Sequence, residues 1–385
     1  MWGTPEERER KRRIDIAAWA YAYEIDNDPL VDDATFDREC ELVNLSIRTG
    51  NKKLDDYFCK HFQPHTGQWI HKHPNKSGIA HIVELKRKGK RMSEDALFGP
   101  GEQKLLAAKI KDDIDAYTAA IYDDGHRKHL GGSMIGDECS RKLWYSFRWC
   151  LTPDFVNTKG EDHKGRLMRL FNRGHKEEDR FVEWLRGMGF EVEEVDPETG
   201  KQFRISDVNG HFGGSLDGRV KLPAQYGNLP MMLLEFKTSS DRYFTKLVQN
   251  GVKVEKPVHF VQMSTYGEKY TLKYALYMAV NKNTDEIYVE VVELDWEVGR
   301  RSIIKAGQII GAQTPPPKLS ENSAYFSCKF CDFASICHGQ ASYEKSCRSC
   351  KFASAVEDKQ WRCEHFGVIP DEFIAKGCDS WQEAR

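Results

Sequence analysis

The sequence predicts an α/β protein in which a mainly helical module precedes an α/β core and a cysteine-rich ribbon follows it. Apolar residues recur at helical spacing before residue 125, whereas strand-like runs alternate with turn residues between residues 190 and 294. Most of the 11 cysteines lie beyond residue 326, in a short and loop-rich stretch. These observations predict a helical module at residues 1–125, a core at 126–340 and a ribbon at 341–385.

The composition is that of an ordinary globular protein. A chain of 385 residues with 40% hydrophobic content can bury one sizeable core and smaller attachments. Because the net charge is only -2, contact with nucleic acid must depend on local basic patches and bound cations. The charged start and the lack of a run of about eighteen apolar residues predict no membrane association and a cytoplasmic location, the host cytoplasm if the chain is phage-encoded. In that reducing compartment, C-x2-C pairs indicate metal ligation rather than disulfides.

The elements of the helical module follow from its apolar spacing. Residues 12–45 have helical periodicity that breaks at residues 27–29, which predicts a helical hairpin. Residues 46–92 are rich in Gly, Pro, His and Lys and have weak periodicity, and residues 102–122 predict a further helix.

The core is predicted to begin with an amphipathic helix from Arg180 to about Met188 and to end with a helix near Ile303 to Gly311, which residues 314–317 terminate. Between these helices the sequence predicts strands within residues 190–195, 201–206, 210–222, 231–238, 274–280 and 286–294.

Three charged residues of the core are candidates for catalysis. Asp217 stands at the end of one predicted strand, and Glu235 and Lys237 alternate on the next, which places them on one face. Two carboxylates at adjacent strand ends can bind Mg²⁺ or Mn²⁺, and a nearby lysine can hold the attacking water or help to deprotonate it. The alternative is a solvated Glu-Lys pair on a strand surface. Because the flanking residues are apolar, we expect instead that both charges are partly buried, which is unfavourable unless they coordinate something.

The order of motifs resembles the RecB-like branch of the PD-(D/E)xK nucleases, which share a restriction-endonuclease-like core. The resemblance covers roughly residues 130–340 and rests on His175, Asp217, Glu235-Phe236-Lys237 and Gln262-x3-Tyr266. It implies that His175, Asp217 and Glu235 bind the metal and that Lys237 serves the water. It also implies that the helix carrying Gln262 and Tyr266 lies against the site and the DNA. Glu178, one helical turn beyond His175, could face the same site.

One cysteine group flanks the core. Cys328, Cys331 and Cys337 form C-x2-C-x5-C, and Cys139 precedes the core, with Cys150 as the competing fourth ligand. This layout is similar to that of the iron-sulfur RecB-like nucleases, including AddB and the CRISPR-associated cluster nucleases. The resemblance implies a structural [4Fe-4S] cluster. A four-cysteine zinc site has the same ligand count and remains the alternative.

A second cysteine group lies in the ribbon. Cys347, Cys350, Cys363 and Cys378 form C-x2-C-x12-C-x14-C, and His365 is available as a substitute ligand. A segment of this length is too short to build its own core, so a structural zinc ion is the simplest way to fold it.

Two basic segments are candidates for DNA contact. Arg141, Lys142 and Arg148 lie on a predicted helix beside Cys139, together with aromatic residues, as single-strand-binding surfaces do. Residues 85–91 form a second candidate patch, although basic helix faces are usually only solvated.

The N-terminal hairpin resembles the one that begins NAD-dependent DNA ligases. Tyr23, Pro29, Asp33, Phe36 and Asp37 carry the likeness, which departs by an extra residue before the proline and by phenylalanine where tyrosine is usual. Because the chain lacks the ligase lysine motif, the hairpin is interpreted as a docking module rather than a nicotinamide site.

Together these features predict a phage-type, Mg²⁺- or Mn²⁺-dependent exonuclease that acts on DNA ends in recombination, repair or replication, with proteins of those processes as partners. One alternative is a module that binds DNA ends without cutting them, and another is a nuclease that acts on RNA.

Overall fold

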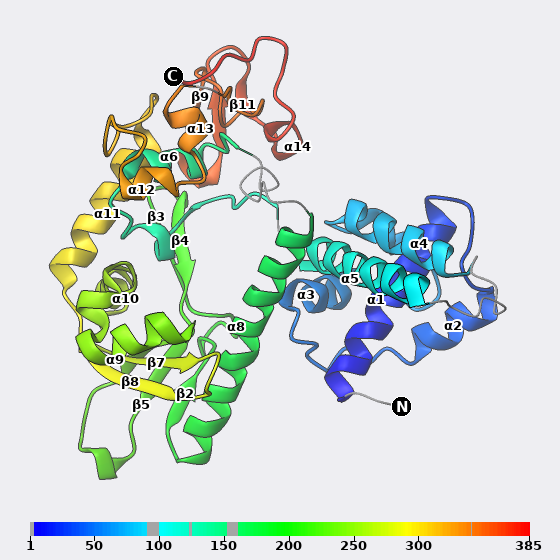
Figure 1. Cartoon of the computed structure of the whole chain (residues 1–385), viewed down its shortest axis with the longest axis horizontal. Coiled ribbons are helices and arrows are strands. Elements are labelled where there is room, and N and C mark those ends of the chain that lie inside the picture. The colour runs from blue at the N-terminus through cyan, green and yellow to red at the C-terminus, as the bar shows by residue number, and fades with distance from the viewer. Residues whose placement is uncertain (1–3, 91–99, 123–124, 152–160, 340) are drawn as a thin grey trace. The chain divides into compact units, whose positions relative to one another are not determined.

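The computed structural model describes residues 4–90, 100–122, 125–151, 161–339 and 341–385 and divides the chain into two compact units (Figure 1). The first unit comprises residues 1–123 and 157–176, and the second comprises residues 124–156 and 177–385. The long helix α8 (Glu161–Gly187) contributes to both units. None of the described helices is long and apolar enough to cross a bilayer.

The first unit is helical, as the sequence predicts. A capping box between Thr4 and Glu7 starts its first helix, earlier than the apolar spacing indicates. The predicted hairpin and the helix at residues 102–122 are confirmed. The helices between them were not predicted, because they are short and their apolar faces are interrupted by charged residues. The elements are α1 (Pro5–Glu24), α2 (Asp33–Glu41), α3 (Lys52–His61), η1 (Gln68–Lys72), α4 (Lys76–Lys90) and α5 (Pro100–Tyr122).

A buried ion network joins the helices of the first unit. The guanidinium of Arg13 is fully buried and contacts Glu9 at 3.0 Å and Asp55 at 2.7 Å. It also donates to the carbonyl oxygens of Asn44 and Ile47, so its charge and its N–H groups are satisfied. This network anchors the long connection after α2 to helix α1.

A five-stranded sheet of order β2-β5-β6-β7-β8 is the centre of the second unit. Only β6 and β7 are parallel in this sheet, and helices α9 (Asp241–Glu255) and α10 (Pro257–Tyr270) form the crossover between them. The C-terminal part of α8 covers the opposite face, where the rings of Phe181 and Phe236 stack at 5.2 Å. The mixed α/β class is therefore confirmed. The strands are β2 (Glu191–Glu193), β5 (Gly218–Lys221), β6 (Met232–Ser239), β7 (Tyr274–Asn281) and β8 (Ile287–Glu293).

A smaller sheet of order β1-β4-β3 lies beside this core and contains β1 (Leu130–Gly131), β3 (Arg204–Asp207) and β4 (Phe212–Ser215). Helices α6 (Ser140–Phe147) and α11 (Trp296–Gly311) belong to the same unit, together with the short 3₁₀ turns η2 (Gly132–Met134) and η3 (Ala224–Tyr226). Helix α11 starts earlier than predicted, because Asp295 caps it. It packs closely on α10, since a Cβ added at Gly299 would stand 2.5 Å from the carbonyl oxygen of Ser264.

The C-terminal ribbon belongs to the second unit and packs on it through two buried arginines. Arg148 donates to the carbonyl oxygens of Cys350 and Ala353, and Arg348 donates to those of Arg127 and Lys128. The elements of this region are α12 (Phe326–Lys329), α13 (Ala334–Cys337), β9 (Ala353–Ala355), η4 (Glu357–Lys359), β10 (Trp361–Cys363), β11 (Gly367–Ile369) and α14 (Asp371–Ile374).

Candidate functional site

The predicted acid pair lies where two neighbouring strands meet. Asp217 immediately precedes β5, and Glu235 lies within β6, with Gly218 paired to Leu234 in the register. The backbone N–H of Phe236 donates to Asp217 Oδ2 at 2.7 Å, which fixes the aspartate beside the glutamate strand. Glu235 is 0% exposed, so the expectation of a buried carboxylate is confirmed.

Lys237 lies on the same face of β6 as Glu235, as the period of two predicts. Its ammonium forms an ion pair with Glu235 Oε1 and donates to the carbonyl oxygen of Phe236 at 3.1 Å. The acidic partners Glu235 and Asp217 outweigh the desolvation of the lysine and raise its pKa. Lys237 is therefore an ammonium at neutral pH, which suits it to hold a water or an anion rather than to accept a proton.

The carboxylates of the site destabilise one another. Burial and the neighbouring Glu235 and Glu178 raise the pKa of Asp217 to about 8, against the opposing effect of Lys237. Burial and Glu178 likewise raise the pKa of Glu235. The buried carboxylate of Glu235 and the half-buried carboxylate of Asp217 thus share one ammonium, with the third acidic group of Glu178 nearby. This excess of negative groups favours binding of a proton or a cation.

Helix α10 brings Gln262 and Tyr266 to the site. Gln262 Nε2 donates to Glu235 Oε2 at 3.1 Å. The ring of Tyr266 is buried and packs directly on Gly214 and Gly132. A Cβ atom added at Gly214 would stand 2.0 Å from the tyrosine hydroxyl oxygen, and one added at Gly132 would stand 2.7 Å from the ring. Burial raises the pKa of Tyr266, and Glu235 and Asp217 raise it further, so the tyrosine keeps its proton. The structure therefore brings together Asp217, Glu235, Lys237, Gln262 and Tyr266.

Two further residues that the sequence analysis did not select border Lys237. The ring of His259 shares a hydrogen bond of 3.0 Å with the hydroxyl of Tyr277, whose strand position is paired with Glu235. Burial and the Lys237 ammonium lower the pKa of His259 to about 3, so the imidazole is neutral. Its position three residues before Gln262 on one helix was the signal that could have identified it.

His175, the remaining predicted metal ligand, is exposed on α8 and belongs to the first unit. Its metal role stays a prediction. Glu178, one helical turn further along α8, belongs to the second unit and raises the pKa of both acids.

The donor set of the acid site fits a divalent cation. Carboxylate oxygens are the ligands that Mg²⁺ and Mn²⁺ prefer, and Asp217 has the carboxylates of Glu235 and Glu178 near it. Throughout the described residues, however, no group of three or more His, Cys, Asp or Glu side chains is arranged to hold a metal ion. Metal binding here and at both cysteine groups is therefore a proposal.

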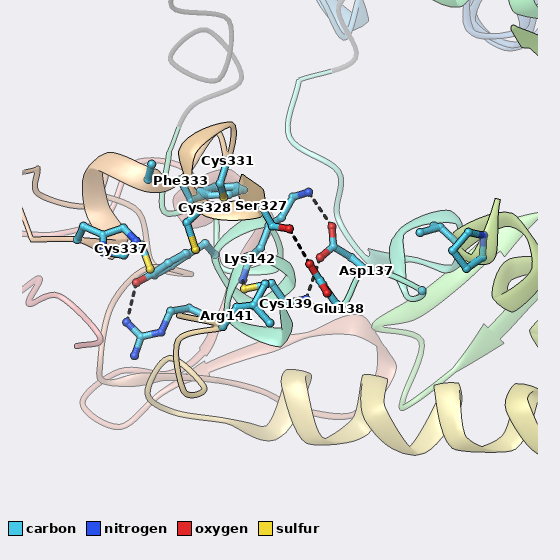
Figure 2. A pocket seen from close by; sticks show the side chains of 17 residues that line it. Asp137, Glu138, Cys139, Arg141, Lys142, Ser327, Cys328, Cys331, Phe333 and Cys337 are labelled. Atoms are coloured by element: carbon cyan, nitrogen blue, oxygen red, sulfur yellow. Dashed lines mark hydrogen bonds and ion pairs between the residues drawn. The ribbon is translucent and has the colours of Figure 1, made fainter. Parts of the chain in front are cut away.

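The first cysteine group surrounds a cavity of about 380 Å³ (Figure 2). Cys139, at the N-cap of α6, faces Cys328, Cys331 and Cys337 from the C-terminal segment. Cys150 lies elsewhere, fully buried in the hydrophobic core, where its carbonyl oxygen accepts from Glu344. The geometry thus favours Cys139 over Cys150 as the fourth member of this group.

The second cysteine group is also gathered by the fold. The thiols of Cys350, Cys363 and Cys378 all lie close enough to Cys347 to raise its pKa, in addition to the larger effect of burial. Because Cys347 and Cys350 lie in one loop and Cys363 ends β10, the set comes from separate segments. The ring of His365 packs on Phe352 at 4.4 Å.

The residues predicted to contact DNA all have partners within the protein, and of the three Arg148 is fully buried. Arg148 is fully buried, and its guanidinium lies between the rings of Trp144 and Trp361 at 5.2 and 5.3 Å, so the prediction that it contacts DNA is wrong. Arg141 donates to the carbonyl oxygen of Pro316, and Lys142 forms an ion pair with Asp137 at 2.7 Å. The alternation of cations and aromatic rings in this helix reflects cation–π packing within the core.

The second candidate patch is neutralised where it is described. Lys86, Arg87 and Lys88 each form an ion pair with a carboxylate, and residues 91–99 lie outside the described residues. The carboxylate partners are Asp15, Asp26, Asp28 and Glu84.

No model of a known protein family matches the sequence, and no curated protein matches it either. Two solved structures of the alkaline exonuclease LHK-Exo from Laribacter hongkongensis are similar to this chain, with 15% sequence identity. One of them is in complex with dAMP. Their TM-scores are 0.31 and 0.30, and the matches cover 48% and 47% of this chain and 87% and 86% of those chains. The structure of SSO0001 is similar with a TM-score of 0.38 and 14% identity, over 62% of this chain and 100% of that chain. Likeness at this level does not identify a function, which must be argued from the site.

Proposed function

We propose that this protein is a metal-dependent DNA nuclease whose site is formed by Asp217, Glu235 and Lys237. The observation that carries the proposal is the unbalanced charge of this buried cluster. A structural ion pair needs one carboxylate and one ammonium, whereas Asp217 adds a second, half-buried carboxylate next to the Glu235–Lys237 pair. Such an excess of carboxylates is unfavourable unless a proton or a cation relieves it, and we infer that in this site a divalent cation does so.

In the proposed mechanism each side chain has a separate task. Asp217 and Glu235 would hold Mg²⁺ or Mn²⁺, with His175 as a proposed third ligand, and Gln262 orients Glu235 through its hydrogen bond. A cation bound there would supply Lewis-acid chemistry to phosphodiester hydrolysis. Lys237, as an ammonium, holds the water or the developing negative charge on the phosphate.

The finer parts of the proposal follow from the family resemblance. We infer an exonuclease that removes nucleotides from DNA ends, encoded by a phage and serving recombination, repair or replication. Cys139, Cys328, Cys331 and Cys337 are proposed to hold a [4Fe-4S] cluster or a zinc ion, since four thiols surround one cavity. Cys347, Cys350, Cys363 and Cys378 are proposed to hold zinc. Both sites would tie the C-terminal segment to the core.

The test follows end-labelled linear DNA with anaerobically purified protein and Mg²⁺ or Mn²⁺. Asp217→Ala and Lys237→Ala are compared with Lys273→Ala and Glu293→Ala, which alter an exposed ion pair of the same sheet. We expect the first pair of variants to lose cleavage by at least about 100-fold and the control pair to retain it. Progressive loss of the label also reveals the polarity of an exonuclease.

The same assay separates the alternatives. Cleavage of labelled RNA at a rate equal to that of DNA would favour the RNA nuclease. Absence of cleavage with either metal, while all variants bind DNA equally, would overturn the enzyme and favour a module that binds DNA ends without cutting them.

A further inference from the structure

Three exposed cations from separate parts of the second unit gather around one histidine. Arg127 precedes β1, Arg204 begins β3, and Lys359 ends η4 of the C-terminal ribbon. All three have exposed side chains. Burial lowers the pKa of His129, and the nearby charges of Arg127, Arg204, Lys359 and the buried Arg348 lower it further, to about 4. The imidazole between them is therefore neutral, and the cluster owes its charge to the three longer side chains.

The fold holds these residues in place through the β3–β4 turn. The backbone N–H of Lys359 donates to the carbonyl oxygen of Asn209 at 2.9 Å. The lysine stem lies over Gly210, where an added Cβ would stand 2.5 Å from Lys359 Cγ. His129 lies over Gly213 of β4, with its ring 3.7 Å from the position of an added Cβ. A tight turn with glycines on its surface thus positions a ribbon residue next to the smaller sheet.

The three cations are not neutralised by carboxylates. Neighbouring cations are paired, since Lys128 contacts Asp371 at 2.9 Å and Lys269 contacts Asp207. Within the described parts of the chain, Arg127, Arg204 and Lys359 form no ion pair. Among the described residues, the guanidinium of Arg127 donates one long hydrogen bond, of 3.5 Å, to the hydroxyl of Ser133. Glu357 and Asp358 adjoin Lys359 in sequence and are the acidic residues nearest to it along the chain. An exposed, unpaired cluster of this kind favours an anionic ligand.

The smaller sheet lies between the cluster and Tyr266 of the acid site. The tyrosine hydroxyl lies against Gly214, the next residue of β4 after Gly213. The same tyrosine is within electrostatic range of Glu235, Asp217, Lys237 and Arg127. Because consecutive strand residues face opposite sides of a sheet, Tyr266 and His129 lie on opposite faces of the smaller sheet. A chain of phosphates bound at Arg127 must therefore pass the edge of this sheet to reach the proposed hydrolytic centre.

We propose that Arg127, Arg204 and Lys359 bind the phosphate backbone of a polynucleotide and direct it toward Asp217 and Glu235. The inference rests on the proposed nuclease function and assigns substrate binding to a part of the molecule that the sequence analysis did not select. It also gives the ribbon a role in the reaction, because Lys359 is a ribbon residue. Guanidinium and ammonium groups contact phosphate without regard to base, so this surface recognises the backbone rather than a sequence.

The experiment measures binding of a fluorescent single-stranded oligonucleotide by anisotropy, in buffer without added Mg²⁺ or Mn²⁺ so that the ligand stays intact. The triple variant Arg127→Ala, Arg204→Ala, Lys359→Ala is compared with Lys273→Ala, Arg300→Ala, Arg301→Ala. The control removes equal charge from exposed cations that are paired with Glu293 and Glu297. Thermal unfolding of both variants verifies that each is folded.

We expect the first variant to bind more than about tenfold more weakly. The slope of log K against log salt should fall by about 0.7 for each phosphate that the variant no longer neutralises. The conservative variant Arg127→Lys, Arg204→Lys, Lys359→Arg should retain binding. Equal affinity and equal slope for the two alanine variants would overturn the proposal, even if metal-dependent cleavage is present. If the wild type binds through these cations but cleaves nothing with either metal, the proposed function fails and the binding surface stands.

Discussion

Two groups of buried charge in the second unit contrast with each other. Around Lys237, the buried carboxylate of Glu235 and the half-buried carboxylate of Asp217 share a single ammonium. The guanidinium groups of Arg348 and Arg148, by contrast, stack on tryptophan rings and donate to backbone carbonyl oxygens. Neither of these guanidinium groups forms an ion pair with a carboxylate within the described residues.

The difference shows why burial of charge does not by itself indicate function. Burial lowers the pKa of Arg348 to about 9 and that of Arg148 to about 10, so both remain charged at neutral pH. Aromatic rings and backbone carbonyl oxygens are their partners within the protein, while the Nε atom of each arginine has no hydrogen-bond partner among the described residues. In the acid cluster, Asp217 and Glu235 both depend on the one ammonium of Lys237, which leaves an excess of negative charge. The two arginines find their partners within the protein, whereas the acid cluster has one carboxylate more than its ammonium can balance, which a proton or a cation can neutralise.

Arg348→Ala tests the structural half of this comparison and should have the largest effect on stability. The substitution removes the stacking on Trp149 at 4.3 Å and leaves the carbonyl oxygens of Arg127 and Lys128 without their donor. We expect a loss of about 3 kcal/mol in the free energy of unfolding, measured by chemical denaturation. Arg362→Ala, at an exposed position of β10, is the control and should change stability by less than about 0.5 kcal/mol. Equal losses in both variants would contradict a structural role for the stacked arginines.

The sequence predicted the acid cluster better than the arginine pair, for a physical reason. Alternation within β6 is a local property, so it placed Glu235 and Lys237 on one face correctly. The environment of Arg148 depends on Trp361, more than two hundred residues away, and the helical sequence around it looked like a basic, aromatic binding surface. Long-range packing of this kind leaves no periodic signal.

The same limit applies to the cysteines and to the basic cluster. Spacing within the C-terminal segment grouped Cys328, Cys331 and Cys337, but only the fold distinguished Cys139 from Cys150 as their neighbour. The basic cluster consists of Arg127, Arg204 and Lys359, which are far from one another in the sequence. They come together because the β3–β4 turn and the ribbon pack against each other. Contacts between distant segments were therefore the part that the sequence did not predict.

Gly214→Ala sharpens the comparison by disturbing the acid site without changing a charge. The added Cβ would stand 2.0 Å from the hydroxyl oxygen of Tyr266, which must shift together with α10 and Gln262. We expect a loss of about 2 kcal/mol in stability and a reduced rate of DNA cleavage. Combining it with Tyr266→Phe removes the clashing oxygen and should restore part of the stability, as measured by thermal unfolding. Gly174→Ala, on α8 with open space around its Cβ position, should not destabilise the protein. A double variant that is no more stable than Gly214→Ala would show that the tyrosine hydroxyl is not the source of the strain.

Asp217→Asn tests the functional half and should have the smallest effect on stability, with the opposite sign. The pKa of Asp217 is raised to about 8 in the folded protein, mainly by burial and by Glu235, against 3.8 as its ordinary value. A raised folded-state pKa stabilises the protein at low pH, and this contribution is lost as pH rises through the folded-state value. Without added Mg²⁺ or Mn²⁺, we therefore expect the wild type to lose stability between about pH 4 and pH 8 relative to the variant. Near pH 8 the variant should be the more stable protein, with a higher Tm than the wild type. Adding Mg²⁺ should reverse the order, because the cation stabilises only the protein that has the full carboxylate set. A variant that is less stable than the wild type at pH 8 in the absence of metal would mean that Asp217 belongs to a satisfied structural network, like that of the arginines, and not to a site completed by a cation.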